Sequence, residues 1–169
     1  NFVDRISDNL KENSKVIIDT GCSIAWFMQS IRTPETVRVF HDCNNTAMGW
    51  APPASIGGYY ADLGKSPIIT IVGDGGFMMN SQELETAVRL KLNLITIIFN
   101  DNGYGMIKWK QAAQDLSDFA LDFNNPDFVM YANSYGATGH RIASSEELIP
   151  TMEKAFTDGG VHVIDLPID

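Results

Sequence analysis

The chain has 169 residues, enough for one domain with a buried core, and 44% of them are hydrophobic, as is usual for a globular protein. Its formal net charge of −9 excludes a surface built to bind nucleic acid or an anionic membrane, because no basic patch offsets that charge. No apolar stretch reaches membrane-spanning length and two cysteines are too few for a disulfide framework, so we expect a cytoplasmic protein.

Short apolar runs alternate with helical patterns along the chain. The first residues form an amphipathic pattern without an initiator methionine, so we expect an internal piece of a longer polypeptide. Strands rich in isoleucine and valine are predicted, in chain order, at residues 16–19, 37–40, 68–72, 94–100, 140–142 and 161–166. Helices are predicted at residues 23–31, 47–63, 81–90, 128–135 and 146–157. Residues 111–126 are the least regular segment, with no convincing periodicity after Ala113, and are predicted to form a surface excursion.

The predicted strands lack the polar alternation of a half-exposed sheet, which indicates parallel strands covered on both faces. We therefore predict an α/β fold: one domain over residues 1–169, with a parallel sheet of about six strands and helices on both faces. Ligands of such sheets bind beyond the carboxyl ends of the strands. The loops after Asp19, Phe40, Val72 and Asn100 are therefore the candidates for a functional site.

The loop after the third predicted strand reads Gly-Asp-Gly-Gly-Phe, from Gly73 to Phe77. Its glycines allow the backbone to approach a phosphate closely. The carboxylate of Asp74 would repel a bare phosphate, but it fits a site where a divalent cation bridges carboxylate and phosphate. In the purely structural alternative, the glycines form a tight strand–helix turn and Asp74 caps the helix.

Two other glycine patterns do not meet the requirements of known nucleotide motifs. A dinucleotide fingerprint would need a third glycine where Met78 stands. The stretch from Gly58 to Ser66 resembles a P-loop, but its glycines are one residue too far apart and it precedes a predicted strand instead of following one. We therefore expect neither kind of nucleotide site.

The fourth predicted strand ends in Asn-Asp-Asn-Gly, from Asn100 to Gly103. Two strands thus present Asp74 and Asp101 at their carboxyl ends. Because neighbouring strands lie about 4.8 Å apart, the two side chains can converge on one hard cation, and Mg²⁺ would take its remaining oxygens from water and phosphate. The alternative is that Asn-Asp-Asn-Gly is ordinary turn chemistry.

Together these motifs resemble the signature of thiamine-diphosphate-dependent enzymes, in which Gly-Asp-Gly is followed, one helix and one strand later, by a pair of asparagines. The resemblance implies the thiamine diphosphate-binding fold, with Mg²⁺ held by Asp74, Asp101 and the backbone carbonyl of Gly103. The chain departs from the family at Asp101, where most members have asparagine. Some acetolactate synthases have aspartate there, and either side chain offers an oxygen ligand.

The resemblance extends to two further loops. Residues 19–23 resemble the family's first phosphate-side loop, and a glycine turn into a helix is the alternative. Residues 46–57 resemble the segment that holds the cofactor bent, with Met48 beneath it and the Thr46 carbonyl accepting from its 4′-amino group; the alternative is a core methionine. The cofactor-binding residues that the resemblance implies are Gly21, Cys22, Ser23, Thr46, Met48, Asp74, Gly75, Gly76, Asp101, Gly103, Tyr104, Gly105 and Met106.

Within the family, residues 80–88 and 104–107 are most similar to the large, catalytic subunit of acetolactate synthase. Such enzymes decarboxylate pyruvate and transfer the two-carbon unit to a second 2-keto acid, in branched-chain amino acid biosynthesis or in catabolism. Lys110 stands where the anabolic enzymes carry a tryptophan in the acceptor pocket, so the identity of the acceptor substrate stays open. Another thiamine-diphosphate-dependent decarboxylase or carboligase is one alternative, and a non-catalytic binding or assembly module is another.

The resemblance also implies parts of the enzyme outside this chain. The glutamate that activates the cofactor in this family belongs to a separate pyrimidine-binding domain, so we expect no catalytic residue here and an inactive isolated chain. N-terminal and central domains are expected to precede this one, and whether they carry FAD stays open. The whole enzyme is expected to be a homodimer or tetramer that acts on small 2-keto acids.

Overall fold

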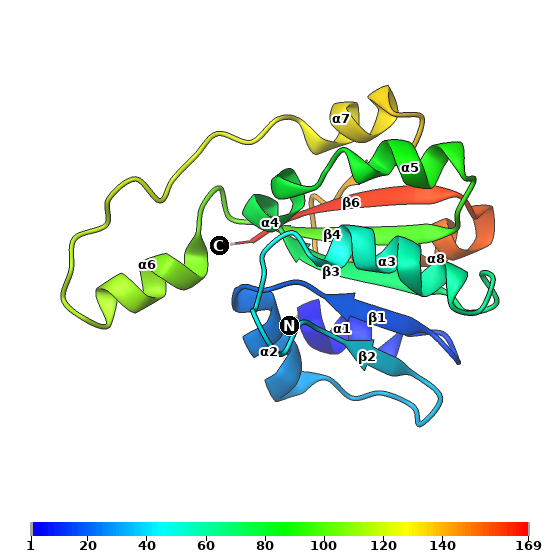
Figure 1. The fold of residues 1–169 in the computed structure, drawn as a ribbon, viewed down its shortest axis with the longest axis horizontal. Helices are drawn as coiled ribbons and strands as arrows, with labels where there is room; N and C mark the ends of the chain where they lie inside the picture. The colour runs from blue at the N-terminus through cyan, green and yellow to red at the C-terminus, as the bar shows by residue number, and fades with distance from the viewer. Residues whose placement is uncertain (1, 169) are drawn as a thin grey trace.

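A computed structural model describes residues 2–168 of the chain, so Asn1 and Asp169, the ends of the predicted domain, lie outside the described residues. One parallel sheet runs through the molecule, with its strands in the order β2-β1-β3-β4-β6-β5 (Figure 1). The strands are β1 (Lys15–Ile18), β2 (Arg38–Phe40), β3 (Ile68–Gly73), β4 (Leu94–Asn100), β5 (Thr138–Arg141) and β6 (Val161–Pro167).

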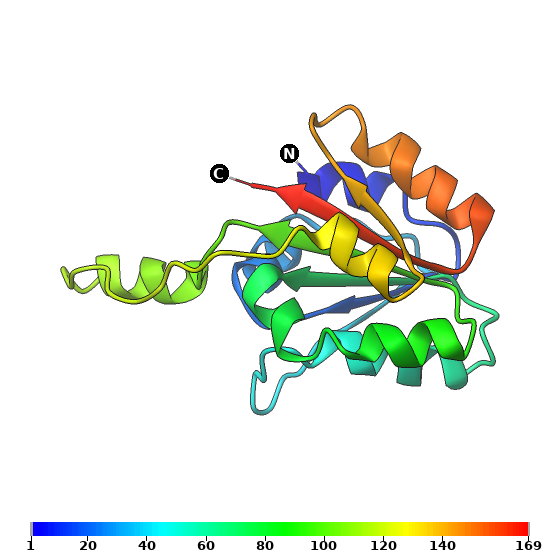
Figure 2. The same ribbon diagram turned by 90° about the horizontal axis from the view of Figure 1, so that it is seen from above.

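Helices cover both faces of this sheet. They are α1 (Phe2–Asp8), α2 (Cys22–Ser30), α3 (Ala51–Tyr60), α4 (Asp74–Met79), α5 (Glu83–Arg89), α6 (Gly105–Ala112), α7 (Phe128–Ser134) and α8 (Leu148–Asp158). Figure 2 shows α1 and α8 on one face and α3 and α5 on the other. The predicted α/β fold with a parallel, six-stranded sheet is therefore confirmed. Among the helices of residues 2–168, none is both long and apolar enough to cross a membrane.

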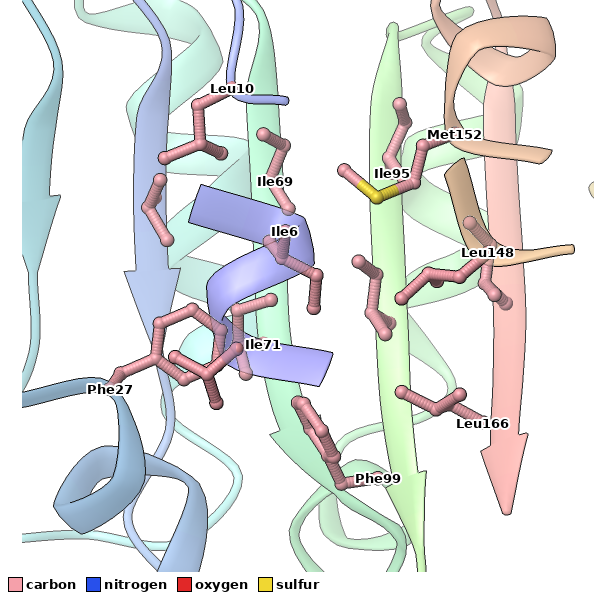
Figure 3. Packing of buried hydrophobic residues seen from close by; sticks show 14 of the residues in the cluster. Ile6, Leu10, Phe27, Ile69, Ile71, Ile95, Phe99, Leu148, Met152 and Leu166 are labelled. Atoms are coloured by element: carbon pink, nitrogen blue, oxygen red, sulfur yellow. The ribbon is translucent and has the colours of Figure 1, made fainter. Parts of the chain in front are cut away.

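The first face of the sheet buries side chains from three helices (Figure 3). Ile6 of α1, Phe27 of α2 and Met152 of α8 pack against Ile71 of β3 and Ile97 of β4. Each of these side chains is at most 1% exposed. Burial on this scale removes the apolar side chains from water and provides the main stabilisation of the fold.

The second face is buried by a separate cluster. Val72 and Ile98 point to this side of β3 and β4, where Phe77 of α4, Leu84 of α5 and Phe128 of α7 cover them. Alternate residues of the central strands thus enter opposite clusters, and all seven residues of β4 are buried. This explains why the strand sequences show no polar alternation.

Helix α3 differs from its predicted bounds for reasons of backbone conformation. Helix α3 begins at Ala51 instead of residue 47, because Gly49 (φ 76°) has a left-handed backbone that an α-helix cannot include. It ends at Tyr60, before Leu63 (φ 58°) takes the same conformation. Helices α1, α4 and α6 were not among the predicted helices; α4 begins at Asp74, directly after β3.

The predicted surface excursion starts later than expected, because residues 111 and 112 belong to α6. Residues 105–120, which we call the arm, project from the body of the molecule (Figures 1 and 2). Every residue of the arm is described, and none is buried. Its base is closed by two hydrogen bonds, from the Tyr104 N–H to the Leu121 carbonyl (3.0 Å) and from the Phe123 N–H to the Asn102 carbonyl (3.1 Å).

Candidate functional site

A cavity of about 280 Å³ lies at the carboxyl ends of the strands, where the prediction placed the functional site. The loops after β1, β2, β3 and β4 and the first turns of α2, α4 and α6 surround it. Its lining residues are Thr20, Gly21, Cys22, Ser23, Trp26, Thr46, Met48, Gly73, Asp74, Gly75, Gly76, Phe99, Asp101, Gly103, Tyr104, Gly105, Met106, Ile107, Lys110 and Ile168. All the residues predicted to contact the cofactor are among them.

The list of predicted cofactor contacts left out several apolar residues that line the cavity. The ring of Trp26 meets that of Phe99 edge-on, with centroids 6.0 Å apart, and Ile168 lies on the same cavity. A signal for each was present in the sequence. Phe99 and Ile168 lie at or just beyond the carboxyl ends of strands, and Trp26 lies one helical turn after Cys22, on the same side of α2.

Asp74 is the buried carboxylate of the cavity, with only 1% of its surface exposed. It is the first residue of α4, and its Oδ1 accepts the Gly75 N–H at 2.8 Å. Its Oδ2 accepts from the side-chain amide of Asn125 at 2.6 Å. Asn125 was not predicted, because it comes 51 residues later and approaches only through the return of the chain from the arm.

Burial raises the pKa of Asp74, and the nearby carboxylate of Asp101 raises it further, while the hydrogen bonds from Asn125 and Gly75 oppose the shift. A divalent cation between the two carboxylates would offset both the cost of burying the Asp74 charge and its repulsion from Asp101. Across residues 2–168, no three histidine, cysteine, aspartate or glutamate side chains form a metal-binding group. A cation here would therefore take its other oxygens from backbone carbonyls, water or a ligand, as Mg²⁺ commonly does.

Gly105 allows the start of α6 to lie close to this pair. A Cβ atom on Gly105 would lie 2.5 Å from Oδ2 of Asp101 and 3.5 Å from Sγ of Cys22. Any other residue would thus displace the Asp101 carboxylate. The thiol of Cys22 has a pKa raised by burial and by Asp101, so we assign it to the cavity wall and not to nucleophilic chemistry.

Asp19 holds the Met48 segment in place, a role that the sequence did not reveal. Its buried carboxylate, at the end of β1, accepts the N–H groups of Gly49 (2.8 Å) and Ala51 (3.0 Å). It therefore supplies negative charge to the N-terminus of α3, whose first turn has no acidic residue. Met48 itself is half-buried, lines the cavity and belongs to neither core cluster.

The stretch that resembles a P-loop lies elsewhere. Gly64, Lys65 and Ser66 precede β3 and line a separate cavity of about 180 Å³ at the amino ends of the strands. The order of elements is thus the reverse of a P-loop, as predicted.

Comparisons with known proteins identify the family of the chain. A family described as "Thiamine pyrophosphate enzyme, C-terminal TPP binding domain" matches residues 19–166; thiamine pyrophosphate is another name for thiamine diphosphate. The chain is 32% identical over 168 residues to acetolactate synthase of Bacillus subtilis, covering 99% of the chain and 29% of that protein. It is 31% identical over 168 residues to the catabolic acetolactate synthase of Raoultella terrigena, covering 99% of the chain and 30% of that protein.

A more distant relative bears a different name. The chain is 27% identical over 171 residues to 3D-(3,5/4)-trihydroxycyclohexane-1,2-dione hydrolase of Listeria monocytogenes, covering 96% of the chain and 27% of that protein. The chain thus spans less than a third of the length of each of these relatives.

Proposed function

Because the chain belongs to the thiamine pyrophosphate enzyme family, as its C-terminal cofactor-binding domain, we propose that it binds the diphosphate of thiamine diphosphate through Mg²⁺ in an acetolactate synthase-like enzyme. The observation that carries this proposal is the single cavity that Asp74, Asp101 and the glycine-rich loops line together. When bound, thiamine diphosphate supplies the carbanion chemistry for cleaving and forming bonds beside a keto group.

We assign the residues of the cavity to three tasks. Asp74, Asp101 and the carbonyl of Gly103 would hold the cation, since all three offer oxygen. The backbone amides of the loops beside them would bind the diphosphate, with Gly21, Cys22, Ser23, Gly75, Gly76, Tyr104, Gly105 and Met106 in contact. Met48 would support the bent cofactor and the Thr46 carbonyl would accept from its amino group.

The proposed reaction is decarboxylation of pyruvate and transfer of the two-carbon unit to a second 2-keto acid. Two relatives named acetolactate synthase, at 31–32% identity, support it. Lys110 supports a substrate that carries a carboxylate, because it is the one positive charge among the described residues that line the cavity and would attract a negative group. The relative named as a hydrolase favours a second candidate, another thiamine-diphosphate-dependent enzyme acting on a different carbonyl compound.

We further propose that the activating glutamate lies on a domain outside this chain, and that the whole enzyme is a homodimer or tetramer. The 29–30% share of the relatives that the chain spans supports further domains. Both cysteines are free thiols, in keeping with the cytoplasm.

Titration of the full-length enzyme with thiamine diphosphate, with and without Mg²⁺, tests the cofactor assignment. We expect binding that depends on Mg²⁺, and absence of binding would leave a non-catalytic module as the better explanation. Formation of acetolactate from pyruvate tests the reaction. The isolated 169-residue chain should be inactive, so turnover by that chain would contradict the assignment of the glutamate to another domain.

A further inference from the structure

Asn125 occupies a position where three oxygen atoms converge. Its Nδ2 atom lies 2.6 Å from Oδ2 of Asp74, 2.9 Å from Oδ1 of Asn100 and 3.3 Å from Oδ1 of Asn102. The residue itself does not line the cavity of the candidate site; it lines a neighbouring one beneath the returning chain. Asn125 therefore contacts Asp74, a proposed cation ligand, from outside the cavity of the candidate site.

The orientation of this amide is set from the interior of the sheet. Asp165 of β6 is fully buried and accepts from Nδ2 of Asn100 (2.9 Å) and from Nη1 of Arg141 (2.8 Å). A carboxylate offers only acceptors, so Asn100 must turn its NH₂ group toward Asp165 and its oxygen toward Asn125. Asn125 must then present its own NH₂ group to that oxygen. Asn125 thus donates to Asp74 on one side and to Asn100 on the other, and Asn100 donates in turn to Asp165.

The other end of the Asn125 amide supports the same conclusion. Within residues 2–168, Oδ1 of Asn125 is buried without a hydrogen-bond partner. An unpaired buried oxygen is unfavourable. Rotating the amide would instead point that oxygen at three other oxygens, one of them on a carboxylate, which costs more. The observed orientation is therefore the one that the surroundings demand.

We propose that Asn125 is a positioning residue for the cation site: it fixes the carboxylate of Asp74 and fastens the chain returning from the arm against it. Held at Oδ1 by the Gly75 N–H and at Oδ2 by Asn125, the carboxylate cannot rotate freely, so its remaining lone pairs keep their direction. Partners of this kind orient metal ligands and raise affinity without touching the metal. The identity of the cation and its ligand rests on the proposed function; the fastening of the chain does not.

Two substitutions separate this role from simple filling of space. Asn125→Asp keeps the shape of the side chain but replaces the donor with an acceptor, and Asn125→Ala removes the amide. In the full-length enzyme, we expect both to weaken Mg²⁺-dependent binding of thiamine diphosphate by about 10-fold to 100-fold. Asn124→Ala, at the exposed neighbouring asparagine, is the matched control and should leave binding unchanged.

Hydrogen exchange of residues 121–126 without cofactor provides the second measurement. Both Asn125 variants should exchange faster there than the wild type, with unchanged exchange in β3 and β4, which also shows that the variants are folded. Asn125→Asp with wild-type affinity and wild-type exchange would overturn the proposal. If the wild type bound no cofactor, the proposed function would fail, and the exchange rates alone would still decide whether Asn125 fastens the chain.

Discussion

The central strands and the arm meet at one cavity but are held in very different ways. All seven residues of β4 are buried, whereas no residue of the arm, 105–120, is buried. The strands bring Asp74 and Asp101 to the site, and the arm brings Met106 and Lys110. The groups proposed to bind the cation thus depend on the core, while the groups proposed to lie near a substrate depend on a segment of low local stability.

The largest effect should come from the core side of this comparison. Phe27 is fully buried and meets Phe99 edge-on, with ring centroids 6.1 Å apart. Phe27→Ala should lower the free energy of unfolding by about 3–5 kcal/mol. Phe119→Ala in the arm, at a side chain 80% exposed, should change it by less than about 0.5 kcal/mol. Chemical denaturation measures both, and equal losses would mean that the arm is as well packed as the sheet.

A second effect concerns the two carboxylates at the strand ends. Asp74→Ala should weaken Mg²⁺-dependent cofactor binding by at least about 100-fold, since changes to the partners of metal ligands alone cost 10–100-fold. Asp101→Asn keeps an oxygen ligand and should cost less than about tenfold. Calorimetric titration of the full-length enzyme compares them. Small and equal effects would contradict the cation site.

Met48 lies between the two regions, on the segment that Asp19 holds. Met48→Ala removes the proposed support beneath the cofactor, so kcat should fall by about tenfold, or about 1.4 kcal/mol. The affinity for thiamine diphosphate should change much less, because the diphosphate contacts remain. Normal turnover combined with lowered folding stability would instead make Met48 an ordinary core residue.

Lys110 tests whether the arm contributes to substrate choice. Lys110→Gln should change the ratio of products formed from mixed 2-keto acids by about fivefold at most, because an exposed charge contributes up to about 1 kcal/mol. Lys108→Gln is the matched control, since Lys108 on the same helix is bonded to Asp122. Identical product ratios for the wild type and both variants would mean that this lysine does not reach the substrate.

The smallest effect lies in the outer strands, away from the site. The rings of His140 and His162 stack, with Nε2 and Nδ1 3.0 Å apart. Burial, followed by the charges of His162 and Lys154, lowers the pKa of His140 below its ordinary 6.5. The unfolded chain then binds this proton at higher pH than the folded chain, so stability should decline as the pH falls below 6.5. Melting temperatures measured as a function of pH report this decline, and His140→Gln should make it smaller. A variant with an unchanged pH profile would exclude His140 as its source.

The sequence allowed the strands and the position of the cavity to be predicted, because both follow from local patterns. Runs of isoleucine and valine indicate strands buried on both faces, and parallel strands place the residues that follow them, such as Asp74 and Asp101, at one edge. The delayed start of α3 depends on the left-handed backbone at Gly49, and a glycine adopts left-handed and right-handed backbones about equally well, so its presence did not reveal which one it has here. The contact between Asn125 and Asp74 depends on where the arm returns, and no local pattern encodes that return.

The closed base of the arm has a consequence for how such a protein can be redesigned. Because the Tyr104 N–H and the Leu121 carbonyl are joined at 3.0 Å, the chain leaves and re-enters the body at nearly one point. Residues can then be inserted or deleted at the tip with an entropic cost that grows only slowly with loop length. The exposed tip, residues 113–120, can therefore be exchanged for segments of other lengths and sequences while Gly105, Met106 and Lys110 keep their places on α6.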